Sequence, residues 1–354
     1  MGGIYLMRND VIENVNFSTL NVKDPFFASL IDDYPGFEKW FEKKSLQNEK
    51  AYIFTENELM GFLYLKEENE ADEDIVPVFE EKRRLKIGTF KIIGHGTVLG
   101  ERFIGLILKQ MIEDNYHDCY VTVFEKQEKL ITLFEKFGFK VWGKKKNGEL
   151  VYTKSLEVND DIYKDFPRIQ TQEKNKFLLS IYPKFHTKLF PYSKLQTEKN
   201  HKIEDLSFTN TTQKVYLSAM RGLEGLKTGD LIVIYRTAEY GQKAEWSAVA
   251  TSVCTVLETK NIRTFKTREE FITYCGKGTI FSEGELNQFW ETKKYPHIIK
   301  MLYNISLPKR IVRHDLIKHE VINRNDYAGF IHLSDEQFEK IIELGEVNES
   351  FIIN

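Results

Sequence analysis

The segments LKIGTFKIIGHGTVLGERFIGLILKQM and DCYVTVFEKQEKLITLFEKFGF lie within residues 85–139 and decide the fold of the first half of the chain. Residues 85–93 form a short apolar run with β-branched and aromatic residues, which predicts a strand. The turn that follows is indicated by glycines at Gly94, Gly96 and Gly100. A strand that passes through a glycine turn into a helix points free N–H groups at the turn, where they can bind an anion.

The helix after this turn is predicted from apolar residues at helical spacing, namely Phe103, Ile104, Ile107, Leu108, Met111 and Ile112. A second strand over 119–124 and a second amphipathic helix over 128–137 follow, and the helix ends at Gly138. The region therefore predicts two strand–helix units in succession. By itself this pattern also fits an ordinary tight turn without any phosphate site.

Two domains are expected from the length of 354 residues. Charged residues make up 29% of the chain, but the net charge is −3, so no overall basic character indicates nucleic acid. The three cysteines, Cys119, Cys254 and Cys275, form no metal cluster or disulfide framework, which is typical of the reducing cytoplasm. No apolar run approaches membrane-spanning length. Because MGGIYLMRNDVIEN lacks a basic region followed by an apolar core, we expect no signal peptide. We therefore expect a cytoplasmic protein without a membrane partner.

Short aromatic helices are predicted near the N-terminus, with a break at Tyr34-Pro35-Gly36 between Phe26, Phe27, Leu30, Ile31 on one side and Phe37, Trp40, Phe41 on the other. From the pattern alone, these aromatic residues are expected in the core. A hairpin is predicted from 51–55 and 60–66, and a second hairpin from 141–143 and 150–154 around Asn147-Gly148. The acidic run EENEADED at 67–74 is most simply a solvated loop, and near a cleft it would attract a cationic amine.

Two stretches resemble the two signatures of the GNAT superfamily of acetyltransferases: LGERFIGLIL at 99–108 and LITLFEKFGFKVWG at 130–143. The resemblance covers residues 1–156 and implies a mixed central sheet flanked by helices. It implies for the aromatic residues near the N-terminus, as the alternative to a core role, that their helices wall the acceptor side of a cleft. It also implies acetyl-CoA as co-substrate and no metal. Thr97 stands at the Q/R position of the first signature, and Arg102 stands where the family has Gly or Ala.

The resemblance implies a cofactor site on three elements. The pyrophosphate cradle would be the backbone of Thr97, Leu99, Gly100, Glu101, Arg102 and Phe103. Main-chain groups of Phe90, Lys91 and Ile92 would hold the pantetheine arm and stabilise the oxyanion, between strands that the family splays apart. Gln127, Leu130 and Phe134 would contact the cofactor from the second helix. Either Arg102 turns outward to grip phosphate, or the loop is remodelled.

The catalytic groups are less clear, because Phe134 stands where relatives have the acidic Tyr, and Lys86 stands near the position of their basic Glu. Tyr120 is the nearest substitute for the acid by sequence. Glu80, Glu81 and His95 are candidates for the base, and a structural role for His95 is the alternative. Proximity and a water relay would also suffice.

The second half begins after a polar stretch, 157–176, that is expected to be a linker. GLKTGDLIVIYRT at 225–237 and AVATSVCTVL at 248–257 resemble PUA-like barrels of the ASCH and EVE type, over residues 177–354. We expect α+β folds throughout, with a small barrel here, a helical insertion around 267–290 and a C-terminal helix near 334–344. Ser334 is its expected N-cap, with Gln337 at the capping-box position.

RNA binding is what the second resemblance implies. Basic and aromatic residues alternate in 183–202, where Lys184, His186, Lys188 and Tyr192 are candidate contacts, and an ordinary loop with buried aromatic residues is the alternative. The sequence hypothesis is thus an N-acetyltransferase directed to RNA, a nucleoprotein or a protein acceptor. The alternative is a non-catalytic GNAT-fold scaffold, for example in a toxin–antitoxin or stress system. A third reading, in which the second domain is itself a hydrolase, needs a lysine, a threonine and a glutamate close together.

Overall fold

The computed structural model describes residues 12–93, 98–190, 211–326 and 329–354. It separates into two compact units, Met1–Glu157 and Val158–Asn354, called unit 1 and unit 2 below. Among the described residues, no helix is both long enough and apolar enough to cross a membrane.

Unit 1 is built on an eight-stranded sheet with the order β1-β2-β3-β5-β6-β8-β7-β4. The strands in this order are β1 (Ile12–Asn16), β2 (Lys50–Thr55), β3 (Leu59–Glu68), β5 (Arg84–Ile92), β6 (Asp118–Val123), β8 (Leu150–Ser155), β7 (Lys140–Lys145) and β4 (Ile75–Val76). Every neighbouring pair is antiparallel except β5 and β6, which run parallel. The strands and hairpins predicted for this half are confirmed within one to three residues at their ends.

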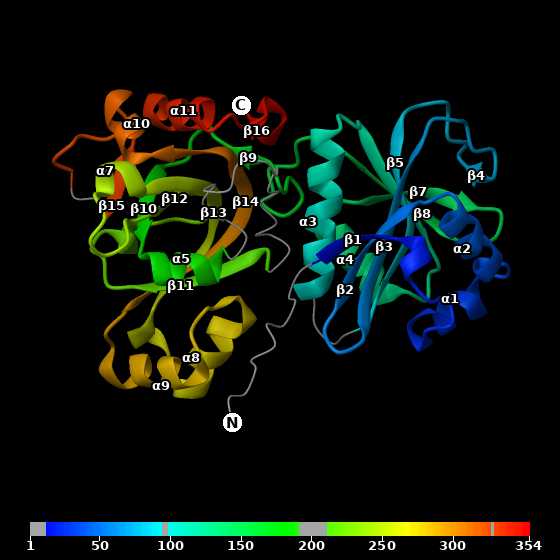
Figure 1. The fold of residues 1–354 in the computed structure, drawn as a ribbon, viewed down its shortest axis with the longest axis horizontal. Helices are drawn as coiled ribbons and strands as arrows, with labels where there is room; N and C mark the ends of the chain where they lie inside the picture. The colour runs from blue at the N-terminus through cyan, green and yellow to red at the C-terminus, as the bar shows by residue number, and fades with distance from the viewer. Residues whose placement is uncertain (1–11, 94–97, 191–210, 327–328) are drawn as a thin grey trace. The chain divides into compact units, whose positions relative to one another are not determined.

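Helices cover both faces of this sheet (Figure 1). On one face lies α3 (Val98–Glu113), and a Cβ placed on Gly61 of β3 would lie 2.5 Å from the Phe103 ring of that helix. The next residue, Phe62, points the other way and packs on Phe41 of α2 (Phe37–Leu46). The predicted break before α2 is confirmed, because α1 (Ala28–Asp33) ends there and Gly36 takes the left-handed φ of 92°.

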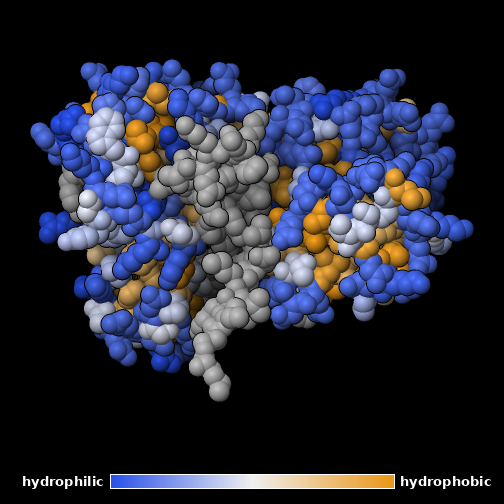
Figure 2. All heavy atoms as spheres, in the orientation of Figure 1, coloured by the Kyte–Doolittle hydropathy of each residue, from blue (hydrophilic) through white to orange (hydrophobic). Residues whose placement is uncertain are grey.

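An aromatic cluster fills the space between α1–α2 and the sheet. Phe17 is fully buried at its centre and makes edge-to-face contacts with the rings of Trp40, Phe41, Phe62 and Tyr64. Figure 2 shows hydrophobic residues of unit 1 reaching the surface over β2 and β3 on this face. The packing fixes the position of α2 on the sheet.

Strand β5 leaves β6 at a bulge. The two strands pair from Arg84↔Asp118 to Ile87↔Val121, and there the ladder stops although β5 continues to Ile92. On its other edge, β5 shifts register against β3 between Ile87 and Thr89, so that Gly88 is the extra residue. A bulge bends the strand that carries it. Gly88 permits the bend, because a Cβ there would lie 2.8 Å from the Tyr64 ring.

Unit 2 contains a six-stranded sheet with the order β11-β14-β13-β12-β10-β15. These strands are β11 (Gln213–Ser218), β14 (His297–Val312), β13 (Val249–Asn261), β12 (Leu231–Arg236), β10 (Lys176–Ile181) and β15 (Phe330–Leu333). Strands β10 and β12 are parallel, and the other neighbours are antiparallel. The described strands form an open sheet with β11 and β15 at its edges, so the closed small barrel expected from the sequence is not confirmed.

Helices of unit 2 pack against this sheet. The predicted insertion is confirmed as α8 (Arg268–Cys275) and α9 (Glu283–Thr292), which share a buried cluster with β11 and the start of β14. The C-terminal helix is confirmed as α11 (Asp335–Leu344), with the capping box between Ser334 and Gln337. The shorter helices are α5 (Pro183–Leu189), α7 (Ala244–Ser247) and α10 (Arg313–Lys318).

The stretch 157–176 corrects one expectation. We expected a free linker from its polar composition, but from Val158 on it belongs to unit 2. Phe166 and Ile169 are buried, and β9 (Ile169–Gln170) pairs in parallel with β16 (Ile352–Ile353). A partner from the C-terminal end of the chain orders this segment, and local composition does not reveal such a partner.

Candidate active site

A cleft of about 950 Å³ opens in unit 1 where β5 and β6 part. Its size falls within the range of small-molecule and cofactor sites. The cleft is lined by β5, β6, the α1–α2 segment, α4 (Glu128–Lys136) with the residue before it, and single residues of α3 and of the β7–β8 turn; these are Ser29, Leu30, residues 33–37, Trp40, residues 86–92, Gly100, residues 121–123, Gln127, Lys129, Leu130, Thr132, Leu133 and Glu149.

One end of the cleft lies between α3 and α4. Gly100, in the first turn of α3, allows close approach of the two helices, because a Cβ there would lie 2.6 Å from Leu133. Leu130 and the amide of Gln127 line this end, as does the exposed Lys129. The first amides of a helix lack partners within the helix and favour anions. This end therefore combines helix amides, an amide side chain and a lysine.

Several side chains expected near the cofactor point into the core instead. The Arg102 guanidinium lies over the Phe54 ring at 4.4 Å, and Arg102 is 4% exposed. Glu101 is buried and bonds Lys136 at 2.6 Å. The rings of Phe103 and Phe134 are fully buried and both pack against Phe90. The outward-turned Arg102 that would grip phosphate is thus not observed.

Strand β5 forms the floor of the cleft from Lys86 to Ile92. Beyond Ile87 no described strand pairs with its β6 side, so the edge is open to a ligand. Lys91 is anchored to α1, since its Nζ donates to Ser29 Oγ at 2.6 Å and to the Phe26 carbonyl. Burial lowers the pKa of Lys91. Phe90, Lys91 and Ile92 all line the cleft.

Helices α1 and α2 line another end of the cleft. Phe37 and Trp40 line it while they also pack on each other and, through Phe41 and Phe17, on the aromatic cluster. The two interpretations of the N-terminal aromatic residues therefore both apply. Phe17, Phe27 and Phe41 are core, whereas Phe37 and Trp40 belong to core and wall alike.

Glu149 enters this end from the β7–β8 turn, and sequence reasoning missed it. Its side chain is 4% exposed; Oε1 accepts a hydrogen bond from the Tyr34 hydroxyl at 3.0 Å, and Oε2 accepts one from Asn147 Nδ2 at 2.9 Å. Burial, and next the charge of Glu149, raise the pKa of Tyr34. The Asn147-Gly148 turn was a signal for the hairpin, and it is confirmed with Gly148 at φ 93°. Nothing in the sequence placed residue 149 beside residue 34.

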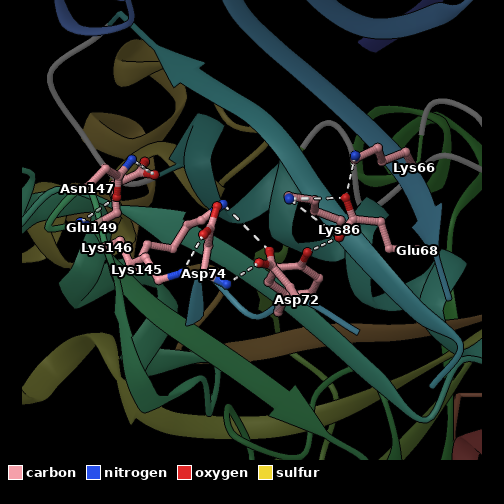
Figure 3. Close-up of polar contacts among 10 residues, drawn as sticks. Lys66, Glu68, Asp72, Asp74, Lys86, Lys145, Lys146, Asn147 and Glu149 are labelled. Atoms are coloured by element: carbon pink, nitrogen blue, oxygen red, sulfur yellow. Dashed lines mark hydrogen bonds and ion pairs between the residues drawn. The ribbon is translucent and has the colours of Figure 1, made fainter. Parts of the chain in front are cut away.

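A second charged group lies where β3 and β5 pair, and Figure 3 shows Lys66 and Lys86 pointing at Glu68. The Tyr120 hydroxyl also donates to Glu68. Burial opposes ionisation of Glu68, but the hydrogen bonds from Lys66 and Tyr120 and the lysine charges outweigh it and lower its pKa to about 2. Burial, followed by the bond to Glu68, raises the pKa of Tyr120.

The candidate acid and bases are not brought together at the cleft. Tyr120 is 1% exposed and does not line it, which corrects the expectation that Tyr120 replaces the missing acid. Its hydroxyl is held by Glu68, away from the lining. Glu81 is exposed and outside the lining, as is Glu80. His95 and Thr97 lie outside the described residues. In the part of the chain that is described, no cluster of His, Cys, Asp or Glu is placed to hold a metal ion.

Of the candidate nucleic-acid contacts in unit 2, two are exposed and one is buried. Lys184 and Lys188 are exposed on α5. His186, on the same helix, is 1% exposed and bonds Thr251 Oγ1 at 3.0 Å. Burial and the charges of Arg236 and Arg310 lower its pKa to about 3, so it is neutral and buried. This corrects its assignment as an RNA contact. Tyr192 lies outside the described residues.

Comparisons with known proteins complete the description. No protein-family model matches the chain, and no curated protein matches its sequence. Among solved structures, an ASCH protein from Zymomonas mobilis is 13% identical over 48% of this chain and 94% of its own, with a TM-score of 0.30. Solved GNAT proteins match as well.

The N-acetyltransferase PseH from Campylobacter jejuni is 17% identical over 41% of this chain and 99% of its own, with a TM-score of 0.28. Arabidopsis thaliana Naa50, in complex with the bisubstrate analogue CoA-Ac-MVNAL, is 16% identical over 41% of this chain and 98% of its own, also with a TM-score of 0.28.

Proposed function

We propose that unit 1 is an acetyl-CoA-dependent N-acetyltransferase. The observation that supports this most is the cleft between β5 and β6, where a strand edge is left open beyond Ile87 beside the start of α3. A cofactor with a long arm and a charged diphosphate needs both features: a slot with free backbone groups and a cluster of amides at its mouth.

In this proposal the diphosphate lies against the backbone amides of the first turn of α3, which begins at Val98, with Gly100 at the cleft surface. Lys129 supplies a cation nearby, and Gln127 bonds an amide of the arm. The arm follows the open edge of β5 along Phe90, Lys91 and Ile92. A backbone N–H of this edge then stabilises the oxyanion that forms at the thioester carbonyl.

The reaction is a direct transfer. The acceptor amine, once deprotonated, attacks the thioester carbon; the C–N bond forms, the C–S bond breaks, and the sulfur leaves with a proton. An ammonium and acetyl-CoA thus yield an acetamide, free CoA thiol and one released proton. Since Phe134 cannot donate a proton, the rate in this proposal depends on alignment of the two substrates.

Unit 2, in the proposal, is a PUA-like domain of the ASCH or EVE type that directs the enzyme to RNA, to a nucleoprotein or to a protein acceptor. The exposed Lys184 and Lys188 on α5 support a phosphate contact. All three cysteines are free and buried, which suits the reducing cytoplasm proposed as its location.

The test of the transferase is release of free thiol from acetyl-CoA by the purified full chain, with an amine panel and cellular RNA as acceptors. We expect thiol release that requires an acceptor. Absence of release with every acceptor, at enzyme concentrations that bind acetyl-CoA, would refute the catalytic proposal.

A non-catalytic scaffold is the second candidate, and a specific observation favours it. Helix α4 contains no tyrosine that could protonate the departing thiolate, and Phe134 stands at that position, fully buried. Tyr120, the expected substitute, bonds Glu68 instead of facing the cleft. The scaffold binds CoA and a partner without turnover. Retention of CoA through purification together with no thiol release would support the scaffold over the enzyme.

A further inference from the structure

We propose that Glu149 binds the positively charged amine of the acceptor, so that the acceptor is an aliphatic ammonium and not the neutral exocyclic amine of a nucleobase. This inference rests on the proposed transferase and names its substrate class. Its starting point is the position of Glu149, which is 4% exposed and lines the cleft beside Tyr34.

The carboxylate of Glu149 is bonded by neutral groups. Its described hydrogen-bond partners are the Tyr34 hydroxyl and the Asn147 amide, and no ion pair among the described residues includes it. A carboxylate has about four acceptor positions, so two remain for a ligand. Burial of a charge without a countercharge is unfavourable. A cation that enters the cleft would supply that countercharge.

Two lysines of the hairpin that carries Glu149 pair with other acids. Lys145 pairs with Asp72 at 3.6 Å and Lys146 with Asp74 at 3.1 Å, although both lie on the same hairpin as Glu149. Figure 3 shows Glu149 with Asn147 at one end of this row of pairs. Asp33, the other acid that lines the cleft, pairs with Lys126 at 2.5 Å. Of the two acids that line the cleft, Asp33 and Glu149, only Glu149 has no ion-pair partner among the described residues.

The walls next to Glu149 suit an aliphatic ammonium. Phe37 and Trp40 line the same end of the cleft, and an aromatic face attracts a cation while it covers the methylenes that carry it. A nucleobase amine is uncharged, so it gains little from a buried carboxylate. The chemistry fits a lysine side chain, a protein N-terminus or a polyamine.

The experiment measures binding and turnover separately. Binding of three cationic probes to the full chain is measured by calorimetry without acetyl-CoA: an N-acetylated peptide with one lysine, a lysine-free peptide with a free N-terminus, and spermidine. Cytidine is the neutral comparison, and the lysine peptide with norleucine in place of lysine tests the charge on the ligand. Thiol release from acetyl-CoA is then measured with the same compounds.

Glu149→Gln keeps an oxygen for the Tyr34 hydroxyl and removes the charge. Its matched control is Glu135→Gln, because Glu135 also accepts from a tyrosine, Tyr152, at 3.0 Å but does not line the cleft. We expect at least one cationic probe to bind about 10-fold or more weakly to Glu149→Gln and unchanged to Glu135→Gln, and its acetyl-transfer KM to rise likewise. Which probe binds identifies the source of the ammonium.

Equal binding of that probe by wild type and Glu149→Gln would overturn the inference, and so would preferred turnover of cytidine. If Glu149→Gln does not fold, the wild-type protein decides: binding must fall when norleucine replaces lysine, or when the free N-terminus is acetylated, and unchanged binding refutes the inference. Amine binding through Glu149 without any thiol release supports the inference and counts against the transferase. The two proposals therefore fail separately.

Discussion

Each unit has one parallel pair in its large sheet, and the two pairs end in different ways. In unit 2, β10 and β12 stay paired over their full length, from Lys176↔Leu231 to Ile181↔Arg236. In unit 1, β5 pairs with β6 only to Ile87↔Val121 and then continues alone to Ile92. A cleft of about 950 Å³ lies where β5 and β6 of unit 1 separate.

The polar groups beyond these pairs also differ. Next to β10, the polar His186 is buried and bonded to Thr251, so it serves the packing of unit 2. Next to the open edge of β5, Glu149 and Lys129 face a cleft. The comparison indicates that the site depends on one interrupted ladder, with the bulge at Gly88 as its physical cause.

The largest expected effect is a loss of acetyl-CoA affinity when a bulky side chain fills the gap between β5 and β6. Thr122 of β6 lines the cleft, and Thr122→Trp places an indole where the arm of acetyl-CoA would pass. We expect acetyl-CoA affinity to fall by roughly 100-fold, about 2.7 kcal/mol, in a calorimetric titration. Thr153→Trp is the control, because Thr153 lies on β8 outside the lining. Equal affinity in both variants would show that the cofactor does not pass between β5 and β6.

Local patterns predicted much of what surrounds this gap. The apolar spacing of Phe103–Ile112 gave α3, and the Asn147-Gly148 dipeptide gave the β7–β8 hairpin, because both depend on residues close in sequence. The bulge at Gly88 was not predicted, since it appears only in the register of β5 against β3. The meeting of Tyr34 with Glu149, 115 residues apart, was equally hidden.

The second half shows the same limit more strongly. The capping box at Ser334 is a local signal and is confirmed. The stretch 157–176 looked like a linker because its order comes from β16 at the far end of the chain. His186 looked like a surface residue because alternation of basic and aromatic residues does not reveal which side chain a short helix buries.

In unit 2, where β10 and β12 stay paired, the buried His186 should make the free energy of unfolding depend on pH. The folded pKa of His186 lies at about 3, below the ordinary 6.5, so only the unfolded state takes up this proton as the pH falls from about 6.5 toward 3. The contribution of His186 to stability is thus present above pH 6.5 and lost on acidification, by about 3 kcal/mol at pH 4.

The measurement is urea unfolding at pH 7 and pH 4, followed by the methyl NMR signals of Val253 in unit 2. His186→Gln should reduce the loss of unfolding free energy between the two pH values, because glutamine does not titrate. An identical loss in the variant and the wild type would show that His186 is not the group responsible.

A smaller effect is expected at the bulge itself. In Gly88→Ala the new Cβ would lie 2.8 Å from the Tyr64 ring, so the strand or the ring must shift. We expect about 1–3 kcal/mol lower unfolding free energy for unit 1. Gly284→Ala in α9 is the control, since a Cβ there meets nothing within 4 Å. If urea unfolding shows Gly88→Ala as stable as this control, Gly88 is not needed for the parting of β5 from β6.

The most direct test of the central claim is a titration of the methyl-labelled full chain with acetyl-CoA. We predict saturable NMR shifts at Ile87, Ile92, Val121 and Val123, the methyl residues on both sides of the gap. The signals of Val233 and Ile234 in the fully paired β12 should stay in place. Saturable binding that leaves the four gap residues unshifted, or no binding at millimolar acetyl-CoA, would contradict the account.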